Sequence, residues 1–443
     1  MVSQPSLWSF IDGSCPGLIP CFLSRSNDAH LDAHIVSRRV EEVISYINPH
    51  IHRLGSLHVE LDPNDDSQLA ALRGLKPAPV LRHLNIECPK FLEINRLGFT
   101  PGIIEPILSL HHLQLFGIRV TPQLAQLTNL TFVSLDVRGG TLRVPLDLLS
   151  RNPLLKVVHL WGEHTNSSED NGHPPGSISL PHLKVLLSGM TPLVDLEALS
   201  PPCGARIFSG FTPGSGPNHQ SGTRIAHFPI PASFSNLRDL RKLCLVDRGE
   251  IYVKLEGEDG SITYFITNKL LQAGTFIGLP VQDVTEATYE ATPLFLRPSP
   301  SAPATSQRLV YHIVCGMTRL QKLELSNCTA EQVEYFLLVL HSINVCKDLK
   351  FLVLSHCVQP HQWMRGLVTM TESRKAAGMG LDGVRIVHSN IEFLKVKFKQ
   401  EDVRRLRHAV GVLEYDQAEE GRGGRSSLRF DPDLGVAQPR MFF

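Results

Sequence analysis

Two stretches, LQKLELSNC at residues 320–328 and LKFLVLSHC at residues 349–357, decide the fold of this chain. Each places aliphatic residues at the first, fourth and sixth positions and a cysteine at the ninth, which is the signature of a leucine-rich repeat. The alternation predicts a short strand that points its aliphatic side chains to one face. We expect Cys328 and Cys357 to occupy equivalent positions in adjacent turns.

The aliphatic part of this pattern recurs along nearly the whole chain. The middle residues of the copies lie at positions 57, 84, 113, 133, 158, 186, 243, 323, 352 and 384, so most single steps fall in or near the window of roughly 20–29 residues typical of such repeats. One repeat cannot bury its apolar face alone, so neighbouring repeats must stack on a shared core. The predicted fold class is therefore α/β, an irregular leucine-rich-repeat solenoid with a curved parallel sheet and with helices and loops on the outer side.

Helical patterns lie between the predicted strands. Residues 38–47, 363–377 and 401–410 have helical character, and residues 330–343 form a stronger helix with Thr329 as its N-cap. The segment Gly378 to Gly383 is expected to end the helix over 363–377 rather than bind phosphate. Residues 30–35 and 412–415 read as further strands.

Four loop insertions interrupt the predicted solenoid, which extends over residues 27–415 after an N-terminal cap at 1–26. They are the polar stretch 162–177, the Pro/Gly/Ser-rich stretch 200–232, an inserted β-hairpin at 249–267 and a Pro/Ser linker at 297–307. Residues 416–443 are expected to be a disordered tail.

Composition narrows the class of protein. Lys plus Arg equals Asp plus Glu at 43 each, so the basic face of a nucleic-acid binder is not expected. The first 20 residues lack Lys and Arg and do not resemble a signal peptide, and no apolar run is long enough to span a membrane. The 9 cysteines are scattered. We expect an intracellular protein, cytoplasmic or nuclear, with reduced thiols.

No motif for catalysis or cofactor binding stands out. The 20 histidines include the close pairs His30/His34, His50/His52, His111/His112 and His159/His164, none of which has Cys or acidic neighbours at zinc-ligand spacing. Cys357 with His361 comes nearest. Hydrolase elbows, metalloprotease helices and nucleotide-binding glycine loops are lacking in the sequence. We therefore expect no catalytic residue, no metal and no cofactor, although unspaced Ser, His and Asp residues leave a hydrolase as a minor alternative.

The N-terminal run QPSLWSFID at residues 4–12, followed by LIPCFLSRS at residues 18–26, resembles the end of an F-box. Together with the strand at 30–35, the helix ending before His50 and the LEGEDGS hairpin at 255–261, it is similar to the F-box-like leucine-rich-repeat proteins of mushroom-forming fungi. The resemblance covers most of the chain in layout, but only the end of the box is represented. It implies an adaptor-binding remnant at Pro5, Leu7, Trp8 and Ile11; the alternative is that these residues simply cap the first repeat.

The resemblance implies a protein-binding role, that of the substrate-receptor subunit of a Skp–cullin–F-box ubiquitin ligase. Such a receptor does no chemistry but holds its target near the ubiquitin-carrying enzyme. The alternative is a stand-alone leucine-rich-repeat scaffold with no ligase link. The expected partner is an unidentified protein target. A Skp-type adaptor is a partner only if the remnant of the F-box still binds it, and neither nucleic acid nor membrane is expected. Phe132 and Trp161 are the candidate target-binding residues, since aromatic side chains dominate protein interfaces, with packing in the core as the alternative for each.

Overall fold

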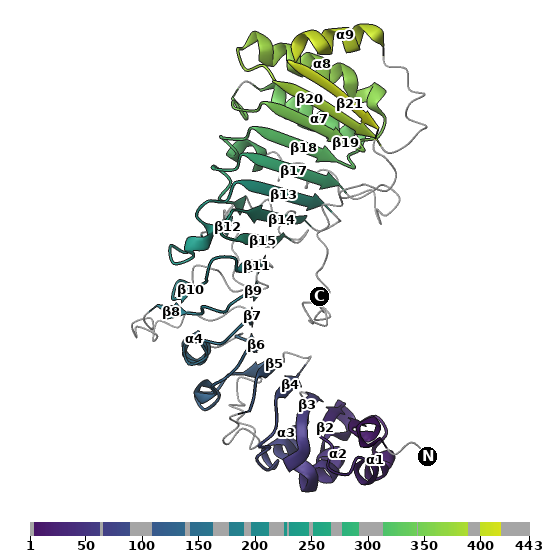
Figure 1. Cartoon of the computed structure of the whole chain (residues 1–443), viewed down its shortest axis with the longest axis vertical. Coiled ribbons are helices and arrows are strands. Elements are labelled where there is room, and N and C mark those ends of the chain that lie inside the picture. The colour runs from purple at the N-terminus through teal and green to yellow at the C-terminus, as the bar shows by residue number, and fades with distance from the viewer. Residues whose placement is uncertain are drawn as a thin grey trace. The chain divides into compact units, whose positions relative to one another are not determined.

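The computed structural model of the chain describes residues 4–62, 65–88, 109–137, 142–162, 177–189, 196–211, 226–227, 230–247, 251–266, 277–291, 313–342, 344–388 and 399–417. These residues form two compact units, one of residues 1–286 and 299–317 and the other of residues 287–298 and 318–443. Both units are α/β, and most of their strand pairs are parallel (Figure 1). None of the described helices combines the length and the apolar character that a membrane span requires.

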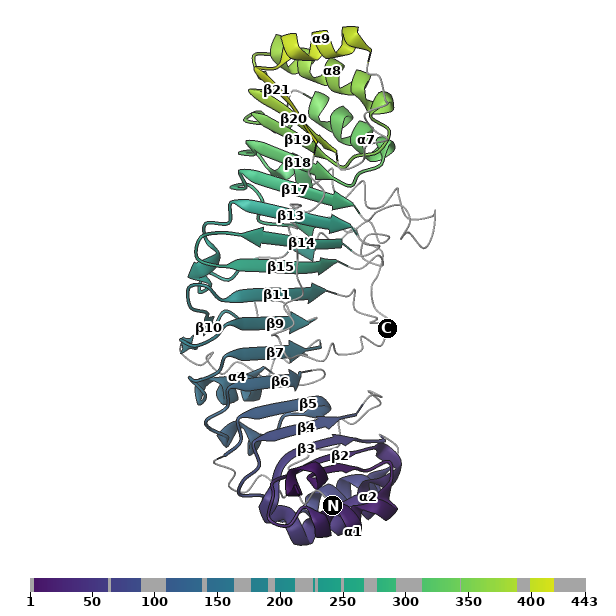
Figure 2. The same ribbon diagram turned by 45° about the vertical axis from the view of Figure 1, so that its right-hand side comes forward.

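The first unit contains a sheet of mainly parallel strands stacked as successive rungs (Figure 2). In spatial order the strands are β1 (Phe10–Asp12), β2 (Leu31–Ile35), β3 (Leu54–Glu60), β4 (His83–Glu87), β5 (His112–Arg119), β6 (Phe132–Asp136), β7 (Val157–Trp161), β9 (Val185–Gly189), β11 (Arg206–Phe211), β15 (Ser261–Ile266), β14 (Ile251–Glu256) and β13 (Lys242–Asp247). Two short parallel pairs accompany it, β8 (Ile178–Ser179) with β10 (Leu199–Ser200) and β12 (Ala226–His227) with β16 (Ile277–Gly278).

The connections of the first unit contain short helices. The α-helices are α1 (Ile19–Arg25), α2 (Val40–Ile47), α3 (Asp66–Arg73) and α4 (Arg143–Ser150). The 3₁₀ turns are η1 (Pro5–Trp8), η2 (Pro16–Leu18), η3 (Ser37–Arg39), η4 (Asn48–Arg53), η7 (Leu124–Gln126) and η9 (Ser235–Leu237). Parallel strands require such crossover segments, because the chain must return to the same end of the sheet before the next strand begins.

The core of the first unit consists of the repeated aliphatic positions. The side chains of Leu57, Leu84, Leu113, Val133 and Val158 are in register on adjacent strands and are almost completely buried. Each of the ten predicted aliphatic copies, seven in this unit and three in the second, contributes to a strand. Helix α2, within the segment 38–47 predicted as helical, adds the buried side chains of Val40, Val43, Ile44 and Ile47.

The second unit repeats the arrangement with longer helices. Strands β18 (Lys322–Ser326), β19 (Phe351–Ser355), β20 (Gly383–His388) and β21 (Val412–Gln417) pair in parallel, and the strand β17 (Glu286–Ala291) lies at the start of the unit. Helix α8 (Pro360–Ala376) contacts both α7 (Ala330–His341) and α9 (Gln400–Ala409), as Figure 1 shows.

Local details of the second unit match the sequence predictions. Thr329 caps α7, and its side chain and that of Gln332 form a reciprocal capping box. Gly378, with a backbone φ of +75°, follows the end of α8 in the left-handed conformation that glycine adopts most readily. Ser326 pairs with Ser355, so Cys328 and Cys357 each follow their strand by the same interval, and both are fully buried. Their equivalence in adjacent turns is confirmed.

The structure differs from the predicted insertions in two places. Residues 206–211 and 226–227, inside the stretch 200–232 predicted as a loop, form strands instead: β11 pairs with β9 and β15, and β12 pairs with β16. The hairpin predicted at 249–267 is present, but its strands β14 and β15 are members of the main sheet. The predicted insertion at 297–307 lies outside the described residues, as do 163–176 of the insertion at 162–177 and all of the predicted tail beyond Gln417.

Candidate functional site

Several rows of side chains line the face of the first sheet opposite its aliphatic core. Parallel register aligns His83 on β4, His112 on β5 and Phe132 on β6 in one row. A second row aligns His34 on β2, His58 on β3, Asn85, Gln114, Ser134 and His159. These residues share a face because successive side chains of a strand point to opposite sides, so every second residue lines the same surface.

The first candidate feature is a chain of ring contacts that combines the first row with His159 of the second row and with Trp161. It is called the histidine–aromatic row here and consists of His83, His112, Phe132, His159 and Trp161. The rings of His112 and Phe132 are stacked, with centroids 3.9 Å apart and planes 2° from parallel. Phe132 meets His159 edge to face at 5.2 Å, and His159 meets Trp161 at 6.2 Å. The row therefore crosses four adjacent strands as a continuous set of ring contacts.

Burial keeps two of these imidazoles neutral at physiological pH. It lowers the pKa of His159 to about 4, and the nearby imidazole of His112 lowers it further. Burial likewise lowers the pKa of His112 to about 4, with His83 as the second cause. Desolvation disfavours the charged form of a base. The central part of the row is therefore an uncharged aromatic surface rather than a cationic one.

Trp161 is held in place by its neighbours on both sides. Its indole nitrogen donates a hydrogen bond of 3.2 Å to the Ser134 hydroxyl oxygen on β6. On β9, Gly189 provides the space for the ring, because a Cβ atom at that position would lie 2.5 Å from the indole carbon Cε3. Both Phe132 and Trp161 remain half-buried, so part of each ring is accessible.

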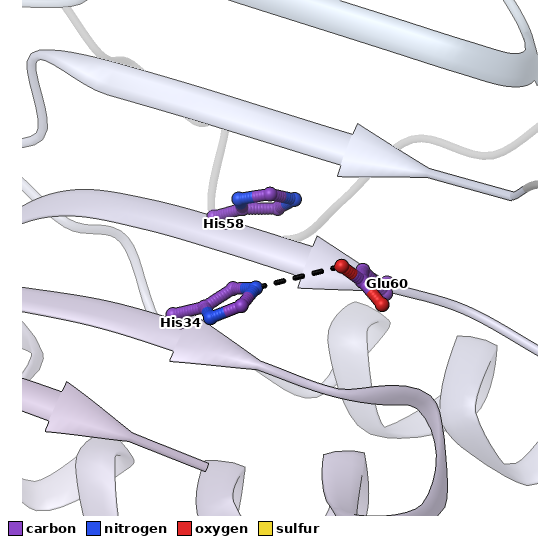
Figure 3. A group of neighbouring side chains, drawn as sticks. All are labelled: His34, His58 and Glu60. Atoms are coloured by element: carbon purple, nitrogen blue, oxygen red, sulfur yellow. Dashed lines mark ion pairs between the residues drawn. The ribbon is translucent and has the colours of Figure 1, made fainter. Parts of the chain in front are cut away.

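The second candidate feature is the His34–His58–Glu60 cluster, shown in Figure 3. His34 on β2 and His58 on β3 are register partners, and their ring centroids lie 4.5 Å apart. Glu60 follows two residues after His58 on the same face, and its Oε1 lies 3.6 Å from His34 Nε2. On the other side of the pair, His58 Nε2 lies 3.7 Å from Glu87 Oε1.

The surroundings of the cluster are polar, and side-chain amides hold one of its neighbouring carboxylates by hydrogen bonds. Glu87 Oε1 accepts hydrogen bonds from the amide nitrogens of Asn85, at 2.9 Å, and Gln114, at 3.2 Å. Burial lowers the pKa of His58, and the carboxylate of Glu87 opposes this shift. Sequence reasoning missed this cluster because it compared histidines by proximity along the chain, whereas His34 meets a histidine one repeat later. The sequence did contain a signal: His34 and His58 each come directly before the last buried aliphatic residue of their strand, so both occupy the same position of the repeat.

The four residues of the predicted adaptor-binding remnant have different surroundings. Ile11 lies on β1, pairs with Ala33 of β2 and is almost fully buried in the sheet core. The Trp8 ring packs edge to face on Phe22 at 5.4 Å, and the Arg25 guanidinium lies 4.4 Å above it.

Pro5, which begins the η1 turn, is half-buried. Leu7 is 62% exposed, and the nearby Phe10 and Leu18 are each 55% exposed. The N-terminal segment therefore caps the sheet through Ile11 and presents apolar side chains on its surface.

Comparison with known proteins adds no assignment. No family model matches the chain, and no curated protein matches its sequence. The functional argument therefore depends on the residues themselves.

Proposed function

We propose that this chain is a protein-binding repeat protein and that its partner binds the histidine–aromatic row. The observation that supports this most is the set of ring contacts from His83 to Trp161, which leaves Phe132 and Trp161 partly accessible on adjacent paired strands. Tryptophan and other aromatic residues contribute disproportionately to binding energy at protein interfaces. Repeat proteins commonly bind their partners through the continuous surface formed by stacked units.

The chemistry of this face favours a particular kind of partner segment. The imidazoles of His112 and His159 are neutral at physiological pH. The carboxylates of Glu60 and Glu87, at the ends of the neighbouring strands β3 and β4, are partly exposed. A complementary segment would place an apolar or aromatic side chain against the row and a lysine or arginine beside the carboxylates. Complementary charge would also speed association and exclude acidic competitors.

In its finer form the proposal is an irregular leucine-rich-repeat solenoid derived from the substrate receptor of a Skp–cullin–F-box ubiquitin ligase. The repeat spacing and the resemblance of residues 4–26 to the end of an F-box support this origin. Exposed Leu7, Phe10 and Leu18 would supply an apolar contact for a Skp-type adaptor. The alternative is a stand-alone leucine-rich-repeat scaffold, which the burial of Ile11 as part of the sheet cap favours.

Selection of a random peptide library displayed on phage tests target binding by this face. We expect selected peptides to combine an aromatic or long aliphatic residue with a nearby basic residue. Trp161→Ala should weaken their binding by at least about tenfold, since loss of an interface tryptophan commonly costs 2 kcal/mol or more. The control is Leu338→Ser, which removes a 71% exposed apolar side chain from α7. Peptides that bind the Trp161→Ala chain as tightly as the unaltered chain would show that the row is not the binding surface.

Co-purification with a Skp-type adaptor separates the two forms of the proposal. The ligase form predicts a complex that Leu7→Asp abolishes, because a charge would be buried in an apolar contact. If the adaptor binds neither this chain nor a chain extended at its N-terminus, the ligase form is wrong and the stand-alone scaffold is the form that remains.

A further inference from the structure

The His34–His58–Glu60 cluster leaves two buried ring nitrogens without hydrogen bonds. The Nε2 atoms of His34 and His58 are both inaccessible to solvent, and neither has a hydrogen-bond partner. Their nearest carboxylate oxygens, at 3.6 and 3.7 Å, are beyond hydrogen-bond distance. Buried polar atoms in proteins are nearly always satisfied, so two unsatisfied nitrogens that converge beside a carboxylate require an explanation.

We propose that His34 Nε2, His58 Nε2 and a Glu60 carboxylate oxygen bind a divalent first-row transition-metal ion, with zinc as the physiological candidate. One ligand atom from each residue lies within 4.8 Å of the other two. In a tetrahedral zinc site, ligand bonds of about 2.0–2.1 Å place the ligand atoms about 3.4 Å apart. The separation of 3.6 Å between His34 Nε2 and Glu60 is already near this value.

The donor set suits this class of ion. Imidazole nitrogens bind zinc, copper, nickel and iron, whereas calcium and magnesium prefer oxygen ligands. Two imidazoles and one carboxylate leave a fourth position for water, the arrangement of an open zinc site. The side chains of His34 and Glu60 are 33% and 45% exposed, so the cluster lies at the protein surface.

The backbone beneath the cluster is anchored by packed core residues. The core residues on either side of the histidines, Ala33 with Leu57 and Ile35 with Val59, are paired in register and buried. A site on adjacent strands of a packed sheet holds its ligands more precisely than a site on loops. Among the described residues, no other group of three such side chains converges closely enough to hold a metal ion.

Glu87 serves as the matched carboxylate for a test of the ligand set. Its Oε1 already accepts two amide hydrogen bonds, from Asn85 and Gln114, and it lies outside the converging group. His83 serves as the matched histidine, since it pairs with His112 on neighbouring strands at 5.7 Å. Variants at these two positions remove the same chemical groups from the same face.

The experiment is titration of the untagged, chelator-treated chain with ZnCl2 by calorimetry and with CoCl2 by visible absorption. We expect one ion per chain and intense cobalt d–d bands typical of four-coordination. His34→Ala, His58→Ala and Glu60→Gln should each weaken binding by at least about 100-fold, because even outer-shell partners of metal ligands contribute 10–100-fold. His83→Ala should change it by less than about threefold. Glu87→Gln removes a carboxylate 3.7 Å from the proposed ligand atom of His58, so it should weaken binding, but by no more than about tenfold and by less than Glu60→Gln does. Circular dichroism of each variant confirms folding.

Three results would overturn the assignment. One is the absence of zinc binding tighter than millimolar by the unaltered chain. Another is zinc binding that the double variant His34→Ala/His58→Ala retains, since the chain has other histidines. The third is loss of binding in Glu87→Gln with retention in Glu60→Gln, which would show a different ligand set.

Discussion

Asn152 is expected to be one of the most sensitive positions of the first unit to substitution. Its side chain is fully buried just after α4. The amide nitrogen donates to the carbonyl oxygens of Leu127, at 2.8 Å, and Leu148, at 2.7 Å, and the amide oxygen accepts from the Leu130 backbone N–H at 2.8 Å. One side chain thus ties the end of a helix to the residues that lead into β6.

The expected cost of Asn152→Ala follows from these three bonds. Each intramolecular hydrogen bond contributes about 1 kcal/mol net, and each buried group left without a partner costs about 1–3 kcal/mol. Some of this cost will be relieved if water enters the space left by the amide. We therefore expect the free energy of unfolding to fall by about 3–5 kcal/mol.

Urea unfolding followed by far-ultraviolet circular dichroism measures this change, and hydrogen exchange of peptides over residues 127–155 locates it. The control is Asn48→Ala, because Asn48 makes an exposed hydrogen bond to the Lys76 N–H and should cost less than about 1 kcal/mol. If the two variants lose similar stability, or if exchange in 127–155 stays unchanged, the reasoning about the buried amide is wrong.

Three further predictions concern other parts of the chain. Arg374→Met should lower the free energy of unfolding in urea by about 3 kcal/mol, since the fully buried guanidinium donates to three backbone carbonyls at the end of α7 and just after it. The control Arg404→Met, which removes an exposed ion pair, should change it hardly at all. Acidification from pH 7.5 to 5 should lower the unfolding free energy by about 2 kcal/mol through His159. Its folded pKa of about 4 lies below its unfolded value of 6.5, so the unfolded chain binds the proton first as the pH falls. A His159→Gln chain with the same dependence of stability on pH would contradict this. Gly189→Ala should displace the Trp161 ring and change the near-ultraviolet dichroism, and an unchanged spectrum would refute the contact.

The sequence predicted those parts of the fold that depend on local pattern. Ten aliphatic copies became strands because three buried side chains per copy leave a strong periodic signal. Strand β11 was not predicted because its sequence, RIFSGF, contains a single core aliphatic residue, Ile207. Ser209 stands where the repeat pattern would have its next aliphatic residue, and Gly210 follows it. The hairpin was predictable from its turn, but the parallel pairing of its second strand with β11 was not, since no periodicity encodes the partner of a strand.

The candidate sites were predictable only in part. Phe132 and Trp161 were selected as aromatic residues on repeat strands, and alternation with the buried residues Val133 and Val158 fixes their face. Their contacts through His112 and His159 depend on register between strands, which sequence spacing alone did not resolve. The His34–His58 pair depends on the same register.

The strand order β11–β15–β14–β13 has a consequence for the order of assembly during synthesis. The ribosome delivers β13 and β14 before β15, yet β15 is the strand that covers the edge of β11. At synthesis rates of about 5–20 residues per second, the β11 edge stays open for roughly 3–11 s after Phe211 is made. An open parallel edge can pair with other chains. The β11 edge is therefore open to misassembly while residues 212–266 are being made.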